Sequence, residues 1–169
     1  MPNHVDNDLR IQGSGKRIQE FLDFAKNNDV MLDADKFIPY PEKYKEQDAK
    51  AIIAARDHKA GLVAFEDYIK VKDGFNSGGY DWCVANWGTK WGIYDCSVVK
   101  TTATSTLLNF STAWSPCLPV IRKMSEMYPD LTFTLRYYEC GCGFKGVYKV
   151  RGGEVIEDMS GQYRGNRGG

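Results

Sequence analysis

Residues 3–22, NHVDNDLRIQGSGKRIQEFL, decide the class of fold. In the first ten of these residues the side chains alternate: Val5, Asn7, Leu9 and Ile11 fall on one side of the chain, and His4, Asp6, Asp8 and Arg10 on the other. A period of two predicts a strand with one buried face and one polar face. Gly13-Ser14-Gly15 predicts a turn, with Ser14 as the cap of a helix. The next apolar residues recur at helical spacing and form one stripe: Ile18, Phe21, Leu22 and Ala25.

The second half of the chain shows the same two patterns, the alternation of a strand and the apolar spacing of a helix. Residues 92–100 and 104–111 predict two strands joined by a Thr-rich turn. Ser115-Pro116 predicts the start of a helix, with Ser115 as N-cap and Pro116 at the first helical position, and Pro129 ends that helix. The strict alternation of residues 131–138 predicts a further strand.

A terminal hairpin follows this strand. Residues 144–150 and 154–159 flank Arg151-Gly152-Gly153, a Gly-Gly turn of the kind that joins two antiparallel strands. The glycine-rich residues 161–169 predict a disordered tail.

Residues 30–81 differ in character from the rest of the chain. Two prolines in residues 37–42 require an extended or looped backbone. A helical pattern then runs from about Asp48 to Lys72, with Gly61 as a point where it divides, and residues 73–79 predict a flexible break. We interpret residues 30–81 as a helical insertion in a single domain of residues 1–160.

Without the insertion, the order is strand–helix–strand–strand–helix–strand, followed by the hairpin. This order predicts an α+β fold, the ferredoxin-like split βαββαβ arrangement, with an antiparallel sheet, two helices on one face and the other face open. We expect the insertion or the terminal hairpin to pack over that open face.

Composition excludes some classes of function. The 169 residues include 22 Lys and Arg against 22 Asp and Glu, so the formal net charge is zero. A protein that coats nucleic acid or membranes through bulk charge is therefore not expected, although a local basic patch stays open. The apolar runs are short, which predicts no membrane span, and the polar N-terminus predicts no secretory signal. Five cysteines in such a chain predict free thiols in a reducing cytosol.

Five short motifs recur in a recognisable order. They are residues 1–5 (MPNHV), 37–42 (FIPYPE), 86–91 (NWGTKW), 94–95 (YD) and 112–116 (TAWSP). Together they resemble the YubB-type ferredoxin-like family of plasmid- and phage-encoded proteins, over most of the chain. Cys117 departs from the pattern, where a second proline is expected. The resemblance implies the fold and an origin in a mobile element, and it brings no established activity.

The tryptophan-rich motifs are the candidate binding site. They lie before the second strand and after the third, so we expect Trp87, Trp91 and Trp114 to meet at one end of the sheet, with Lys90 and Asp95 at the margin. The full set of candidate binding residues is Asn86, Trp87, Gly88, Thr89, Lys90, Trp91, Tyr94, Asp95, Trp114 and Ser115. The structural alternative is an aromatic mini-core that pins the loop. The functional interpretation is a pocket that holds a base, a peptide or a modified nucleotide.

Other sites find less support. The polar strand face carries two carboxylates where an RNA-binding sheet carries aromatic rings. His4, Asp6 and Asp8 lack a distant fourth ligand, and Cys140-Gly141-Cys142 is a single short pair, so we expect no metal. No motif of nucleophilic catalysis or phosphate binding is present, and we expect no cofactor.

These observations favour a non-enzymatic interaction protein from a phage or plasmid. The expected partner is a host protein, and the expected role is to modulate host machinery or counter host defence. The alternatives are a nucleic-acid-binding accessory protein that uses the Trp-rich loop, which we predict over residues 86–95, and an enzyme with an unrecognised site.

Overall fold

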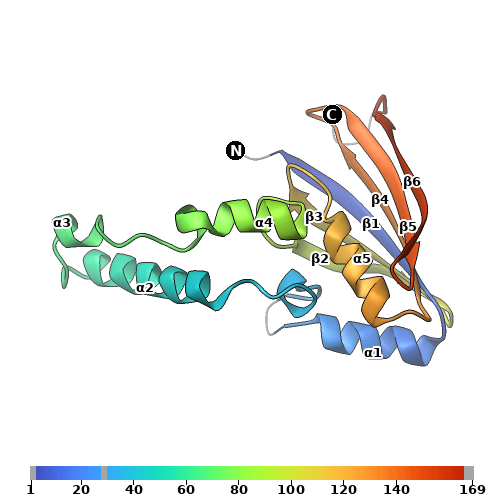
Figure 1. Ribbon diagram of the computed structural model, residues 1–169, viewed down its shortest axis with the longest axis horizontal. Helices are drawn as coiled ribbons and strands as arrows, with labels where there is room; N and C mark the ends of the chain where they lie inside the picture. Colours follow the sequence, from blue (N-terminus) through green and yellow to red (C-terminus); the bar gives the residue numbers. More distant parts are fainter. Residues whose placement is uncertain (1–2, 28–29, 166–169) are drawn as a thin grey trace.

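The computed structural model describes residues 3–27 and 30–165. Within them six strands form one antiparallel sheet in the order β2-β3-β1-β4-β5-β6 (Figure 1). The strands are β1 (His4–Gln12), β2 (Tyr94–Thr101), β3 (Ser105–Ala113), β4 (Thr132–Glu139), β5 (Phe144–Arg151) and β6 (Glu154–Gln162). The first four strands have the predicted split βαββαβ order, and β5 and β6 extend the sheet as a hairpin. The predicted α+β ferredoxin-like fold is confirmed.

β1 is an inner strand of the sheet and pairs with β3 on one side and β4 on the other. Its predicted alternation is confirmed: Val5, Asn7, Leu9 and Ile11 are fully buried. Asn7 is the polar member of this set, and its amide donates to the Val5 carbonyl at 2.9 Å and to the Thr112 hydroxyl at 3.0 Å. Those bonds offset the cost of burying the NH₂ group of the amide, whereas its buried Oδ1 has no hydrogen-bond partner among the described residues.

Two helices cover the buried face of the sheet, α1 (Gly15–Ala25) and α5 (Leu118–Met127) (Figure 1). Phe21 of α1 is fully buried, and its ring lies 5.2 Å from the rings of both Phe133 and Tyr128 and 5.7 Å from Phe37. Edge-to-face and offset rings at these distances are favourable contacts. This aromatic group joins α1, α5 and the sheet.

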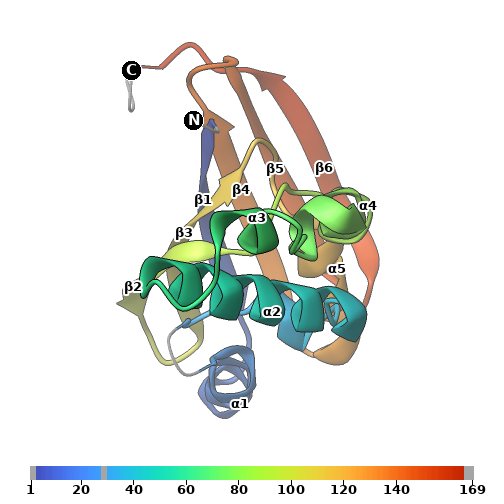
Figure 2. The ribbon, with the colours of Figure 1, turned by 90° about the vertical axis from the view of Figure 1, so that its left-hand side faces the viewer.

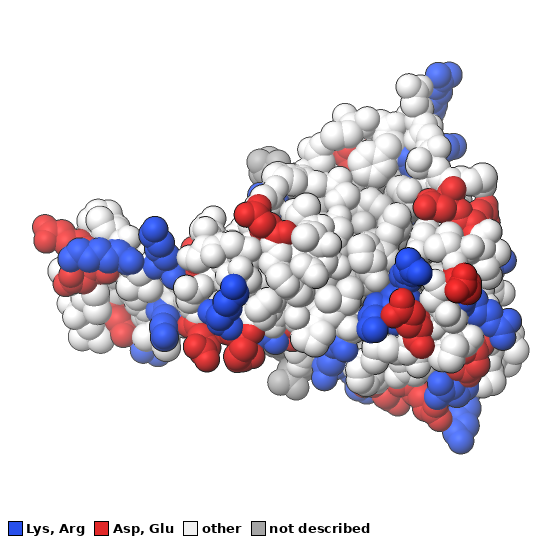
Figure 3. All heavy atoms as spheres, in the orientation of Figure 1, with Lys and Arg blue, Asp and Glu red and all other residues white. Residues whose placement is uncertain are grey.

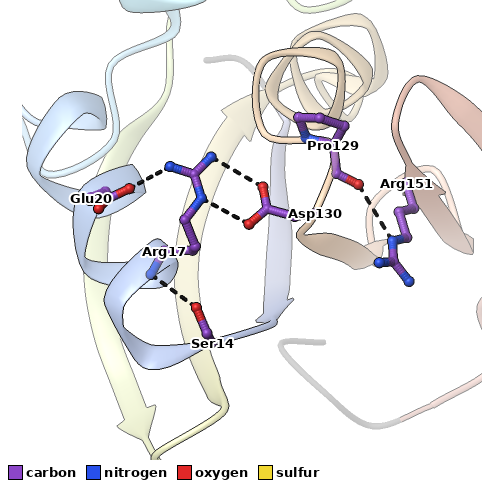
Figure 4. Close-up of polar contacts among 6 residues, drawn as sticks. All are labelled: Ser14, Arg17, Glu20, Pro129, Asp130 and Arg151. Atoms are coloured by element: carbon purple, nitrogen blue, oxygen red, sulfur yellow. Dashed lines mark hydrogen bonds and ion pairs between the residues drawn. The ribbon is translucent and has the colours of Figure 1, made fainter.

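The start of α1 is tied to the loop before β4 (Figure 4). Ser14 caps the helix by accepting from the Arg17 amide, as predicted. The Arg17 guanidinium makes two hydrogen bonds to Asp130, at 2.8 and 3.1 Å, and also pairs with Glu20. The bonds from Arg17 lower the pKa of the Asp130 carboxyl. This exposed cluster orients α1 on the sheet, while burial supplies most of the stability.

The insertion projects away from the sheet. It contains a short helical turn, η1 (Ala34–Lys36), then α2 (Glu42–Lys59), α3 (Phe65–Tyr68), a further turn η2 (Phe75–Gly79) and α4 (Tyr80–Trp87). We call residues 42–79 the arm. It extends to the left of the sheet in Figure 1 and stands in front of the sheet in Figure 2. Neither α2 nor α3 has a buried residue.

The helical boundaries of the insertion differ from the sequence prediction. α2 begins at Glu42, directly after Pro41, rather than near Asp48. Residues 73–79 contain the predicted break as a kink at Ser77 and Gly78, whose backbone angles are not helical, and α4 begins directly after Gly79. The Asp48 carboxylate accepts from the amides of Gly74 and Phe75 at 2.8 and 3.1 Å, and this tertiary contact holds the returning segment against α2.

Two predictions about the rest of the chain are wrong. α5 begins at Leu118 and not at Pro116, and Ser115 is not its N-cap, because the Ser115 hydroxyl donates to the Gly88 carbonyl. The open face is not covered by the hairpin, since β5 and β6 continue the sheet sideways, nor by the arm, which points away.

The predicted tail also differs. β6 continues to Gln162, and the Tyr163 amide donates to the Gly143 carbonyl at 2.6 Å. Residues 166–169 lie outside the described part of the chain. Among residues 3–27 and 30–165, no helix combines the length and apolarity needed to cross a bilayer.

Replacing Phe21 by Ala is expected to destabilise the protein by about 3–5 kcal/mol, because it empties a fully buried site among three aromatic rings. Urea unfolding followed by circular dichroism measures this. The control is Ile52→Ala on the arm, where the side chain is 70% exposed and the change is expected to stay within about 0.5 kcal/mol. Equal losses for the two variants would contradict the assignment of the core.

Candidate functional site

The ten candidate residues lie on two segments that meet at one end of β3. One segment runs from the last turn of α4 to the start of β2, and the other joins β3 to α5. Asn86 and Trp87 belong to α4 and not to a loop, which corrects the predicted Trp-rich loop of residues 86–95. The Asn86 amide bonds back to the Trp82 carbonyl inside that helix at 2.9 Å. Most of the candidate residues fall into two groups, each with members from both segments. One group holds the segments together, and the other gathers two tryptophans around Lys90.

Gly88, Thr89 and Ser115 form the structural group, which we call the junction. Gly88 ends α4 in the left-handed conformation, with φ of 76°, which glycine adopts without strain. The fully buried Thr89 hydroxyl donates to the Ala113 carbonyl at 2.8 Å and accepts from the Ala113 amide at 3.1 Å. The Ser115 hydroxyl donates to the Gly88 carbonyl at 2.5 Å. The junction therefore fixes the end of α4 to the end of β3.

Trp87 does not join Trp91 and Trp114. Its side chain is buried, its indole N–H donates to the Ile38 carbonyl at 2.8 Å, and its ring packs on Tyr40 and Trp82 at 5.6 and 5.3 Å. The structure thus places Trp87 in the mini-core that the structural alternative described.

Lys90, Trp91 and Trp114 form the second group, which we call the Trp–Lys cluster; Trp114 is exposed, and Lys90 and Trp91 are partly buried. The Lys90 ammonium lies 4.3 Å from the centre of the Trp114 ring and 5.1 Å from that of Trp91. Both distances suit a cation–π interaction, for which indole is the best partner. The lysine is therefore within cation–π distance of both rings.

Trp114 is held in an unfavourable backbone conformation. Its φ is 73°, in a region that bulky residues rarely adopt, and 45% of its surface is exposed. Its amide donates to the Asn3 carbonyl at 2.9 Å, which keeps it there. Asp95 is the other non-glycine residue with positive φ, 52°, in the described part of the chain. Such strain, on the order of 1 kcal/mol or more per residue, concentrates at functional sites.

Tyr94 links the cluster to the margin of the sheet. Its ring lies 6.3 Å from that of Trp91, and its hydroxyl is 2.5 Å from Nδ1 of His4. Burial, followed by the charges of Asp95 and Asp6, raises the pKa of Tyr94. This tyrosine therefore stays neutral at physiological pH.

Sequence reasoning missed two residues of this site. Tyr80 packs edge-on against Trp114, with ring centres 6.0 Å apart, and Phe75 lies 6.5 Å from Trp91. Phe75 lies at the end of the arm and Tyr80 is the first residue of α4, on either side of the glycines that predicted a break. An aromatic residue on each side of Gly78-Gly79 was the available signal.

The described residues contain no group of three or more His, Cys, Asp or Glu placed to hold a metal ion. The polar trio of β1 has other contacts: His4 bonds to Tyr94, and Asp8 accepts from the Asn109 amide at 3.0 Å.

Three thiols are unsuited to nucleophilic attack. Burial raises the pKa of Cys83 and Cys96 to about 11 and that of Cys117 to about 12, so each is protonated at neutral pH.

Comparison with known proteins supports the fold. Residues 88–167 match the family model of the ferredoxin-like domain in Api92-like protein. The crystal structure of protein api92 from Yersinia pseudotuberculosis is similar, with a TM-score of 0.57 at 10% identity, over 98% of this chain and 99% of that one. No curated protein sequence matches the chain. The matched domain begins at Gly88, in the junction, and includes β2 to β6.

Replacing Thr89 by Val keeps the side-chain shape and removes the buried hydroxyl. The free energy of unfolding is expected to fall by about 1–3 kcal/mol, because the Ala113 amide loses its partner and the Ala113 carbonyl keeps only the bond from the Lys90 amide at 3.3 Å. Chemical denaturation measures it, with Thr102→Val as the control, since that hydroxyl is exposed and bonds at 3.1 Å to Ser105. A cost no larger than that of the control would contradict the structural role of the junction.

Iodoacetamide at mildly alkaline pH is expected to modify the exposed Cys140 and Cys142 in the native protein and to spare the other three thiols. Burial and the raised pKa of those three both slow alkylation. Mass spectrometry of the digested protein gives the modified sites, and full denaturation should expose all five. Rapid native modification of Cys117 would contradict its placement.

Proposed function

We propose that this protein is a non-enzymatic interaction protein of phage or plasmid origin, which binds a host protein through the Trp–Lys cluster. It acts in the cytoplasm of a bacterial host, where it modulates host machinery or counters host defence. The observation that carries the proposal is Trp114, a half-exposed indole held in a left-handed backbone conformation.

The left-handed backbone conformation of Trp114 lowers the stability of the fold, and the limited burial of its side chain offsets little of that loss. Nearly half of the surface of Trp114 faces solvent, so packing alone does not explain a tryptophan at a position that glycine would occupy without strain. Tryptophan is enriched among the residues that contribute most to protein–protein binding. A strained and exposed indole is therefore better explained by recognition than by folding.

The Trp–Lys cluster is also rigid before a partner arrives. The junction holds the backbone on both sides of the cluster through the Thr89 and Ser115 bonds, and the Lys90 ammonium contacts both indoles. A rigid anchor loses little conformational entropy on binding. The surface over α4 and the loop leading to α5 carries few charges in Figure 3, which suits an apolar protein partner.

The phage or plasmid origin rests on the resemblance of the sequence motifs to the YubB-type family. The host as target follows from that origin, since a protein of a mobile element acts inside the cell that carries it. The absence of a recognisable catalytic motif in the sequence supports a binding role over an enzymatic one.

The test is capture of partners from a nuclease-treated host lysate by wild-type protein and by the Trp114→Gly variant. The variant is expected to keep or raise the melting temperature, because glycine relieves the strain at φ of 73°, and to lose the partner that the wild type retains. Calorimetry with the purified partner then gives the loss of affinity, expected to be about tenfold or more for a central tryptophan.

Leu62→Ala on the arm is the matched control, since it also removes an exposed apolar side chain, 77% exposed, away from the cluster. Capture by this control should equal that by wild type. Retention of the same partner by Trp114→Gly, or the lack of any nuclease-resistant partner, would overturn the proposal.

A further inference from the structure

The open face is the side of the sheet opposite α1 and α5. Figure 1 shows both helices against the other face, and the hairpin of β5 and β6 widens the sheet. Three adjoining hollows of about 520, 600 and 370 Å³ lie on the open face, and Asp8 lines all three. Their volumes fall within the range of ligand sites. They reach from β2 to β6, so the hollowed surface is wider than any single one of them.

Strand register arranges the side chains of this surface in rows. Along the middle row, Asp8 lies opposite Asn109 on one side and Arg136 on the other. Arg136 lies opposite Val147, which in turn lies opposite Met159. The rows on either side pair Thr134 with Lys149 and Tyr138 with Lys145.

The middle of the open face carries a stripe of positive charge. The side chains that β4 and β5 contribute to the hollows include Arg136, Lys145 and Lys149, with no carboxylate among them. Lys145 and Lys149 are four residues apart on β5, about 13 Å, and Arg136 lies between them in register on β4, opposite Val147, so the three cations form a zigzag along the two strands. The zero net charge of the chain therefore conceals a local basic surface suited to a regular polyanion.

The carboxylates of the open face lie beside the stripe, on β1 and β6. Asp8 is engaged by the Asn109 amide, and Glu157 lies on the edge strand opposite Lys149. They border the stripe and do not interrupt it.

Flat and apolar groups accompany the cations. Tyr138 lines two of the hollows, and its ring stacks on that of Tyr163, with centres 5.9 Å apart and planes 20° apart. The largely apolar hollow beside it is lined by Val147 and by Met159, which is 58% exposed. Gly161 leaves open space there, because a Cβ at this position would touch nothing within 4 Å.

We infer that the open face binds single-stranded nucleic acid, with phosphates on the positive stripe and bases against Tyr138 and in the hollow beside Met159. Aromatic platforms next to a basic groove are the general means of holding single strands without sequence preference. The rings come from Tyr138 on β4 and from Tyr163 in the segment after β6. The inference concerns a different surface from the Trp–Lys cluster and stands apart from the proposed function.

The probe is a fluorescently labelled oligothymidylate of about 12 nucleotides. This length is within the range of about 4–16 nucleotides that one single-strand-binding OB-fold covers. Binding by anisotropy is expected to weaken with salt, with a log–log slope of about −2 for three phosphate contacts. The double variant Arg136→Gln, Lys149→Gln is expected to bind about tenfold more weakly and with a shallower slope. Asp8→Asn removes a negative charge from the margin and should tighten binding several-fold.

The matched control is Arg56→Gln on the arm, which removes the same charge from a side chain that is 73% exposed, and it should bind like wild type. All variants are compared after confirming an unchanged melting temperature. Trp114→Gly should also bind the oligonucleotide normally, which separates this result from the test of the proposed function. The inference is overturned if the oligonucleotide does not bind at low salt, if the double variant binds as wild type does, or if thymidine monophosphate binds as tightly as the oligonucleotide.

Discussion

The pairing of β1 on both sides is the constraint on which the rest of the structure depends. Because β1 lies between β3 and β4, both connecting segments that carry α1 and α5 must cross the same face of the sheet. The fully buried Val5, Leu9 and Ile11 face those helices. The alternate side chains of β1 lie on the open face, which carries no helix. The end of β3 is bonded to the segment after α4, and the loop before β4 is bonded to the start of α1.

The insertion shows how a long excursion is accommodated by this sheet. The arm buries none of the side chains of α2 and α3, so its stability comes from few contacts. The Asp48 carboxylate joins its outgoing and returning parts, and α4 then packs on the core through Cys83 and Trp87. The junction completes the return by bonding Thr89 to the end of β3. Consequently the Trp–Lys cluster lies where an insertion re-enters the domain.

The two surfaces that emerge differ in physical character. The Trp–Lys cluster is aromatic, strained at Trp114 and rigid, which favours recognition of a folded partner. The open face is broad, hollowed and locally basic around Arg136, which favours an extended polyanion. Tyr94 connects them at the margin, with its ring near Trp91 and its hydroxyl bonded to His4.

The sequence by itself determined the strands, the two packed helices and the order of elements, because alternation and helical spacing are local signals of burial. It also placed Lys90 beside tryptophans. Only the tertiary structure decided that Trp87 is buried while Trp114 is exposed, since identical side chains differ in what packs over them. Alternation placed Arg136 on the open face, but the positive stripe also needs the register of β4 and β5, which brings Lys149 and Lys145 beside it. Contacts between segments far apart in the chain leave no periodic signal in either one.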